Sequence, residues 1–81
     1  MTPMQYRKLL MEKMLELNDD NYWISTNLLN EELGITETSP QRVGTNLNIM
    51  QRRGYVRRLD NLQLWKLTPR GKEVNIKTFK C

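Results

Sequence analysis

The segment from residue 39 to residue 71 constrains the fold most, because signals for one helix are followed directly by signals for a two-stranded hairpin. Ser39-Pro40 combines a favoured helix N-cap with a favoured first helical residue. The amphipathic stretch that follows ends at Gly54, and two short apolar-rich runs then flank Asp60-Asn61, which tolerate the positive φ of a tight turn. We therefore expect a helix over 40–53 and strands over 55–59 and 62–67, joined by a two-residue turn.

The N-terminal half predicts two further helices and one short strand. Thr2-Pro3 and Gln5 form the start signal of a capping box, and a run of Asn and Asp residues ends this first helix. Residues 22–24 are β-prone but supply only one rung of a small sheet. Either Ser25 or Thr26 is suited to cap a second, short helix. We expect a single α+β domain over 1–81, with a core over about 3–74 and a tail over 75–81.

The expected third helix has two unlike faces. At about 100° per residue, one side collects a buried apolar stripe of Val43, Leu47 and Met50. The opposite side collects polar residues, namely Gln41, Thr45, Asn48 and Arg52, flanked by Arg42 and Ile49. None of them is a carboxylate, whereas an ordinary solvated helix face mixes Glu with Lys. The absence of acid indicates that this face meets a polyanion.

The charge distribution agrees with that interpretation. Residues 1–38 carry three basic and seven acidic residues, a balance of −4, and residues 39–81 carry ten basic and two acidic residues, a balance of +8. The modest net charge of +4 therefore hides a strongly basic C-terminal half. Such a half favours a polyanionic partner, although a merely solvated basic face gives the same count.

Several kinds of site are absent from the sequence. The chain has no histidine, and its one cysteine is the last residue, Cys81, which we expect to lie in solvent. No cluster supplies a metal cage, a phosphate loop or a nucleophile with its base, so we expect no enzyme, no metal and no cofactor. No apolar run approaches the ~18 residues of a membrane span, and a cytoplasmic protein is expected.

Two stretches resemble the winged helix-turn-helix domains of bacterial and archaeal transcriptional regulators. The run VGTNLNIMQRRGYV over 43–56 is similar to their recognition helix and the start of their wing, and WKLTPRGKE over 65–73 is similar to the end of the wing in the MarR and PadR families. In element order the resemblance covers about residues 5–74. The chain departs from these families in two ways. An acidic residue, Asp60, stands at the wing tip, where the families usually have a longer, basic tip. The MarR and PadR families also have extra helices for dimerisation, and we expect no counterpart of these helices here.

The resemblance implies a three-helix core with a small antiparallel β-hairpin wing, whose third helix enters the major groove of DNA. The residues implied to contact bases are Gln41, Arg42, Thr45 and Asn48. Those implied to contact the DNA backbone are Thr26, Asn27, Gly44, Arg52, Arg57, Arg58 and Lys66. For Arg53 we favour a simpler role at the helix C-terminus.

Two functions follow as hypotheses. The first is a small transcriptional regulator, such as a repressor, that binds double-stranded DNA; phage, plasmid or viral genomes would be expected to encode one, and it would then act in the host cytoplasm. The second is a winged-helix protein-interaction module without DNA contact. A second apolar stripe on the first helix, formed by Met4, Met11 and Leu15, is expected either to pack against the C-terminal segment or to contact a second copy in a homodimer.

Overall fold

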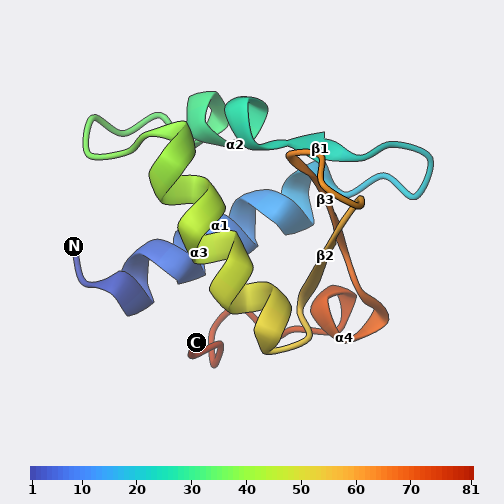
Figure 1. Cartoon of the computed structure of the whole chain (residues 1–81). Helices are drawn as coiled ribbons and strands as arrows, with labels where there is room; N and C mark the ends of the chain where they lie inside the picture. The colour runs from blue at the N-terminus through green and yellow to red at the C-terminus, as the bar shows by residue number, and fades with distance from the viewer.

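The computed structural model describes all residues 1–81 and has an α+β architecture, which confirms the predicted class. The helices are α1 (Pro3–Leu17), α2 (Thr26–Leu33), α3 (Pro40–Arg52) and α4 (Pro69–Lys72). The strands β1 (Ile24–Ser25), β2 (Val56–Arg58) and β3 (Leu64–Leu67) form one antiparallel sheet in the order β1-β3-β2 (Figure 1).

The helices begin where their capping signals predict. Thr2 and Gln5 form the complete capping box of α1, in which the Thr2 side chain accepts from the Gln5 amide at 3.1 Å. Ser25 and Ser39 cap α2 and α3 in the same way, each accepting from the amide three residues further on. Gly34 ends α2 with a left-handed backbone (φ +63°), a conformation that glycine adopts without steric cost.

The hairpin loop is longer than expected. A two-residue turn at Asp60-Asn61 would pair Leu59 with Leu62, but the Leu59 amide donates instead to the Leu64 carbonyl at 3.0 Å. The loop therefore contains four residues, 60–63, and begins with a turn in which the Leu62 amide donates to the Leu59 carbonyl. The predicted two-residue turn is wrong.

Two contacts from outside the loop explain this register. The Arg58 guanidinium donates to the carbonyls of Asn61 and Leu62, which ties the tip of the loop to its own strand. The Thr26 amide at the start of α2 donates to the Gln63 carbonyl at 3.0 Å. Both contacts satisfy backbone carbonyls that a shorter turn would have placed elsewhere.

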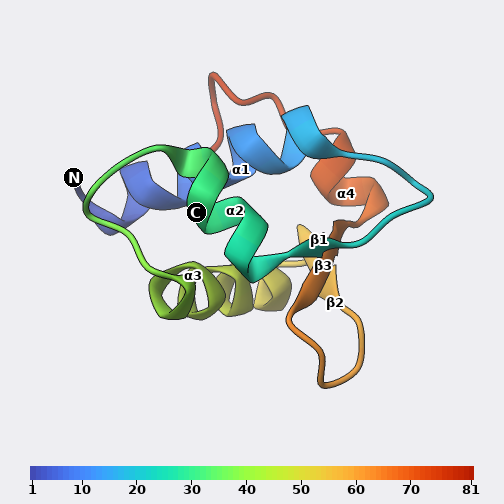
Figure 2. The same cartoon turned by 90° about the horizontal axis from the view of Figure 1, so that it is seen from above.

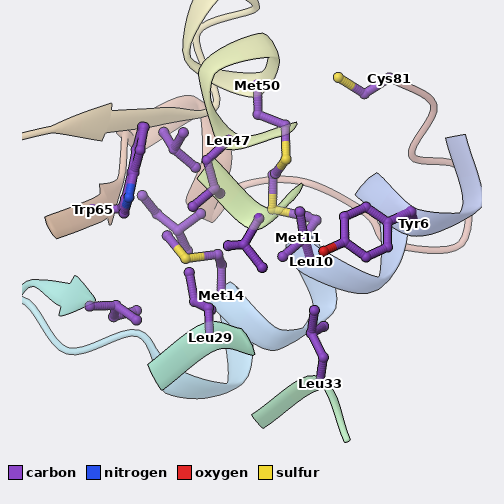
Figure 3. Close-up of a cluster of buried hydrophobic side chains, with 14 of the residues drawn as sticks. Tyr6, Leu10, Met11, Met14, Leu29, Leu33, Leu47, Met50, Trp65 and Cys81 are labelled. Carbon is purple, nitrogen blue, oxygen red and sulfur yellow. The ribbon is translucent and has the colours of Figure 1, made fainter. Parts of the chain in front are cut away.

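The three long helices and one face of the sheet enclose a single hydrophobic core. In Figure 2 the loop between β2 and β3 extends toward the side of the molecule on which α3 lies, and α1 lies behind α3 in Figure 1. The predicted stripe of Val43, Leu47 and Met50 is fully buried, as is Trp65 of β3. Figure 3 shows how side chains of α1, α2, α3 and β3 meet in this core. No helix combines the length and the apolar character that crossing a membrane requires.

The C-terminal segment belongs to the core. Phe79 is buried and packs edge-to-face on Tyr55, with ring centroids 5.0 Å apart. Cys81, expected in solvent, is buried as well, and its main-chain oxygen accepts a 2.8 Å hydrogen bond from Arg7 Nε. Arg7 also donates to the Asn46 side chain and so links α1, α3 and the C-terminal segment. The predicted core limit at residue 74 is therefore too short, because apolar residues beyond it complete the packing.

Candidate nucleic-acid interface

A polar cleft of about 410 Å³ opens between the start of α2, the outward face of α3 and the hairpin loop. Its wall contains no hydrophobic residue and no charged one; it is lined by Ser25, Thr26, Asn27, Pro40, Gln41, Gly44, Thr45, Asn48 and Gln63. In Figure 2 the loop that carries Gln63 extends past α3, on the side away from α1. The cleft therefore brings together three segments that are far apart in the sequence.

The α3 side of the cleft carries most of the predicted base-contacting residues. Gln41 and Thr45 are exposed and Asn48 is half-buried, and all three line the cleft. Arg52 is exposed one turn beyond Asn48 at the end of the helix. The Thr45 hydroxyl donates to the Gln41 carbonyl at 3.0 Å, an i−4 bond that keeps the side chain close to the helix. The expected separation of a buried and a polar face is thus confirmed.

The floor of the cleft is fixed by a buried hydrogen bond. The Trp65 indole Nε1 donates to Thr26 Oγ1 at 2.9 Å, and Thr26 is only 5% exposed. The Thr26 hydroxyl also lies 3.3 Å from the Gln63 carbonyl, and the Thr26 amide donates to that same oxygen. The predicted phosphate contact of Thr26 is therefore wrong, because its polar groups already have partners inside the protein. Asn27 is exposed and lines the cleft.

Arg42 does not join the cleft. Its guanidinium carbon lies 4.0 Å from the centroid of the Tyr6 ring on α1, and its Nη1 donates to the Glu37 carbonyl in the preceding loop. Arg42 lies about 100° around the helix from Gln41, so its side chain reaches the flank of α3 that packs toward α1. The structure therefore does not place Arg42 with the other predicted base contacts.

The predicted basic residues of the hairpin are dispersed. Arg58 is held by the loop carbonyls and lies 5.8 Å from the Trp65 ring, so its role is to shape the loop. Arg57 and Lys66 are register partners and share the face of the sheet opposite Trp65, where both approach the Trp23 ring. None of these three cations lines the cleft. The prediction that they contact the DNA backbone is not supported for Arg58, and for the outer pair it stays a prediction.

Lys66 is also tied to the turn that follows α1. Its Nζ donates to the Asp20 carbonyl at 2.7 Å, while the Asp20 carboxylate forms an ion pair with Lys72 of α4. The hydrogen bond from Lys72 and its positive charge lower the pKa of the Asp20 carboxyl below its ordinary value. These contacts fasten the 18–21 turn to the sheet and to α4, and so they serve the fold.

The apolar stripe of Met4, Met11 and Leu15 on α1, for which a homodimer contact is one of two expectations, lies only partly on the surface. Met11 is fully buried in the core, so it is unavailable to a second copy, and the homodimer prediction is wrong for this residue. Leu15 is half-buried against the same core, and only Met4, at 48% exposure, remains on the surface. Met11 is buried and Leu15 is half-buried because α2, α3 and the C-terminal segment all pack on α1 and cover more than one face of this helix.

Sequence reasoning missed Gln63 as a cleft residue. Read as part of a regular strand after a two-residue turn, it carries no local signal that distinguishes it from its neighbours. Its place follows from the longer loop and from Thr26, which lies 37 residues earlier in the chain. An ideal Cβ on Gly44 would lie 3.7 Å from Gln63 Oε1, so these two residues face one another across the cleft.

No protein-family model, no curated protein and no solved structure matches this chain. The cleft must therefore be interpreted from the chemistry of its own residues. No group of three or more acidic, histidine or cysteine side chains is placed to hold a metal ion. What the cleft offers is a set of hydrogen-bonding amides and hydroxyls beside an exposed arginine at the end of α3.

Proposed function

We propose that this protein is a winged helix-turn-helix protein that binds double-stranded DNA in a sequence-specific manner and acts as a small transcriptional regulator. In this proposal α3 enters the major groove, whose ~12 Å width admits a helix. The β2–β3 hairpin is the wing and lies against the adjacent backbone. Asn27 at the start of α2 and Arg52 at the end of α3 contact phosphates.

One observation carries the proposal most. The exposed side of α3 is free of carboxylates along its whole length, and the hairpin loop projects toward this same side (Figure 2). A helix face that contacts only solvent usually mixes Glu with Lys. Acidic residues on this face would repel a phosphate backbone, so their absence favours contact with DNA. The basic balance of residues 39–81 supports the same partner.

The alternative, a protein-interaction module, has less support. Such a module would use the acidic N-terminal half and the apolar stripe of α1 as its working surface, and the burial of Met11 removes the centre of that stripe. The cleft, by contrast, has no apolar lining, whereas the fully buried centre of a protein interface is more apolar than the surrounding surface.

The direct experiment is fluorescence anisotropy with a mixed-sequence DNA duplex over a range of salt concentrations. Neutralisation of Z phosphates predicts that log K falls with log salt with a slope of about −0.9Z. Arg52→Ala removes one such contact and should reduce the slope by about 0.9. Lys8→Ala is the matched control, because Lys8 lies on α1 outside the cleft and its loss removes the same charge.

Two results would count against the proposal. Absence of binding at low salt would exclude duplex DNA as the partner. Equal effects of Arg52→Ala and Lys8→Ala on the slope would mean that the net charge of the protein, and not the α3 surface, governs the binding.

A further inference from the structure

We infer that the cleft selects duplexes with adenine at the contacted positions, and that Gln63 of the hairpin loop reads the bases together with Gln41 and Asn48 of α3. This inference rests on the proposed DNA binding and adds the base preference and one further specificity-determining residue. It follows from which hydrogen-bonding groups the cleft contains and which it lacks.

The lining of the cleft is dominated by carboxamides. Four of its nine residues carry one, namely Asn27, Gln41, Asn48 and Gln63, and three carry a hydroxyl. A carboxamide presents a donor and an acceptor side by side. Adenine presents the complementary pair, the N6 donor and the N7 acceptor, at its major-groove edge, so Asn and Gln bind it with two hydrogen bonds.

Guanine requires a different side chain. Its major-groove edge offers two acceptors, O6 and N7, which Arg and Lys match best. The cleft contains no cation, because Arg42 is held over Tyr6 and bonded to the Glu37 carbonyl. Thr45 adds to the preference, since its hydroxyl is bonded to the Gln41 carbonyl and its methyl group is available to the methyl of thymine.

Gln63 is positioned for this role before any DNA is bound. Its backbone carbonyl accepts from the Thr26 amide, and Thr26 is in turn fixed by the Trp65 indole. Its side-chain Oε1 lies 3.4 Å from the Thr26 hydroxyl, which occupies one of the two lone pairs of that oxygen; the second lone pair and the amide nitrogen remain available to accept from adenine N6 and donate to N7. A side chain held in this way loses less conformational entropy on binding than a free surface glutamine.

Selection from a pool of duplexes with a randomised centre tests the base preference. We expect adenine–thymine pairs at the contacted positions. Replacing each selected adenine by 7-deazaadenine keeps base pairing and the minor groove but removes the N7 acceptor. We expect a loss of affinity of roughly 2- to 13-fold at each read adenine, which corresponds to about 0.5–1.5 kcal/mol for the one hydrogen bond removed.

Variants assign the contacts to residues. Gln41→Ala and Gln63→Ala should each weaken binding to the selected duplex and make it insensitive to 7-deazaadenine at one position. Gln51→Ala is the matched control, since Gln51 is an exposed glutamine on the same helix that does not line the cleft. Circular dichroism melting confirms that each variant is folded.

The outcomes separate this inference from the proposed function. Three results would overturn the adenine inference: guanine-rich selected sites, selected sites without any base preference, or full affinity for 7-deazaadenine duplexes. If binding still depends on salt in any of these cases, DNA binding itself is retained. Unchanged sensitivity in Gln63→Ala would overturn the role of Gln63. Absence of any duplex binding at low salt would overturn both.

Discussion

The indole nitrogen of Trp65 donates a buried 2.9 Å hydrogen bond to the hydroxyl of Thr26, and this bond joins the central strand of the sheet to the first turn of α2. Thr26 in turn holds Gln63 through its amide and its hydroxyl. The distance between the hairpin loop and the helices is set by these contacts. The width of the cleft therefore depends on the hydroxyl of Thr26, a residue that is only 5% exposed.

Thr26→Val tests that dependence. It keeps the size of the side chain but leaves the Trp65 N–H buried without a partner, and we expect it to lower the free energy of unfolding by about 1–3 kcal/mol. Thr26→Ser, which retains the hydroxyl, should cost less. Urea unfolding at neutral pH measures both, and a Thr26→Ser variant that is as unstable as Thr26→Val would show that packing of the methyl group matters more than the hydrogen bond.

Gly71→Ala should be strongly destabilising. A Cβ at this position would lie 2.0 Å from the Tyr55 carbonyl oxygen and 3.0 Å from Leu67 Cδ2, so α4 would have to move away from the sheet. Overpacking of this kind costs about 1–3 kcal/mol or more, which corresponds to a fall in Tm of roughly 4–8 °C per kcal/mol for a domain of this size. A thermal melt that matches the wild type would contradict the close approach of α4 to Tyr55.

Gly44→Ala should have the opposite effect on stability. Here the added Cβ meets only Gln63 Oε1 at 3.7 Å, an ordinary contact, and alanine favours a helix interior by up to about 1 kcal/mol over glycine. The same methyl group narrows the cleft, so we expect higher stability together with weaker binding to duplex DNA. Unchanged affinity in a stabilised Gly44→Ala variant would mean that DNA does not approach α3 at this residue.

Arg42→Ala should affect stability and leave base preference intact. The interaction of Arg42 with the Tyr6 ring is worth about 0.5–1 kcal/mol at a partly exposed site, and the hydrogen bond to Glu37 is lost as well. Affinities for the selected and for a mixed-sequence duplex should change by the same factor. If the affinity for the selected duplex falls much further than the affinity for the mixed-sequence duplex, then Arg42 leaves Tyr6 on binding and reads a base.

Asp20→Asn should make stability less dependent on pH in acid. Because the pKa of the native Asp20 carboxyl is lowered by Lys72, the contribution of the ion pair is present above the ordinary aspartate pKa and is lost as pH falls through the lowered value. We expect the wild type to exceed Asp20→Asn in urea midpoint at pH 7, and the gap to close below about pH 4. A gap of equal size in acid would contradict the ion pair, and Lys72→Met should reproduce the behaviour of Asp20→Asn.

Much of this fold could be predicted because its signals are local. Ser39 and Pro40 specify the start of α3 by satisfying its first amide groups and by fixing φ, and the spacing of Val43 and Leu47 specifies which side is buried. These effects act within one or two helical turns, so they can be predicted from the sequence of that segment alone.

What could not be predicted depends on contacts between distant segments. Asp60-Asn61 suits a two-residue turn by itself, but Thr26 and Arg58 bind the carbonyls of the loop and impose the longer form. Gln63 enters the cleft as a consequence. Arg42 lies outside the predicted site for a similar reason: its side chain packs on Tyr6, which belongs to another helix and is distant in the sequence.

The most direct test of the account is a titration of the ¹⁵N-labelled protein with a mixed-sequence duplex, followed by two-dimensional NMR at low salt. Binding through the cleft predicts that the largest amide shifts fall on Asn27, on the exposed side of α3 from Gln41 to Arg52, and on Gln63, while the outer side of α1 around Lys8 stays unchanged. Shifts concentrated on α1, or no shifts at all, would contradict DNA binding by the α3 cleft.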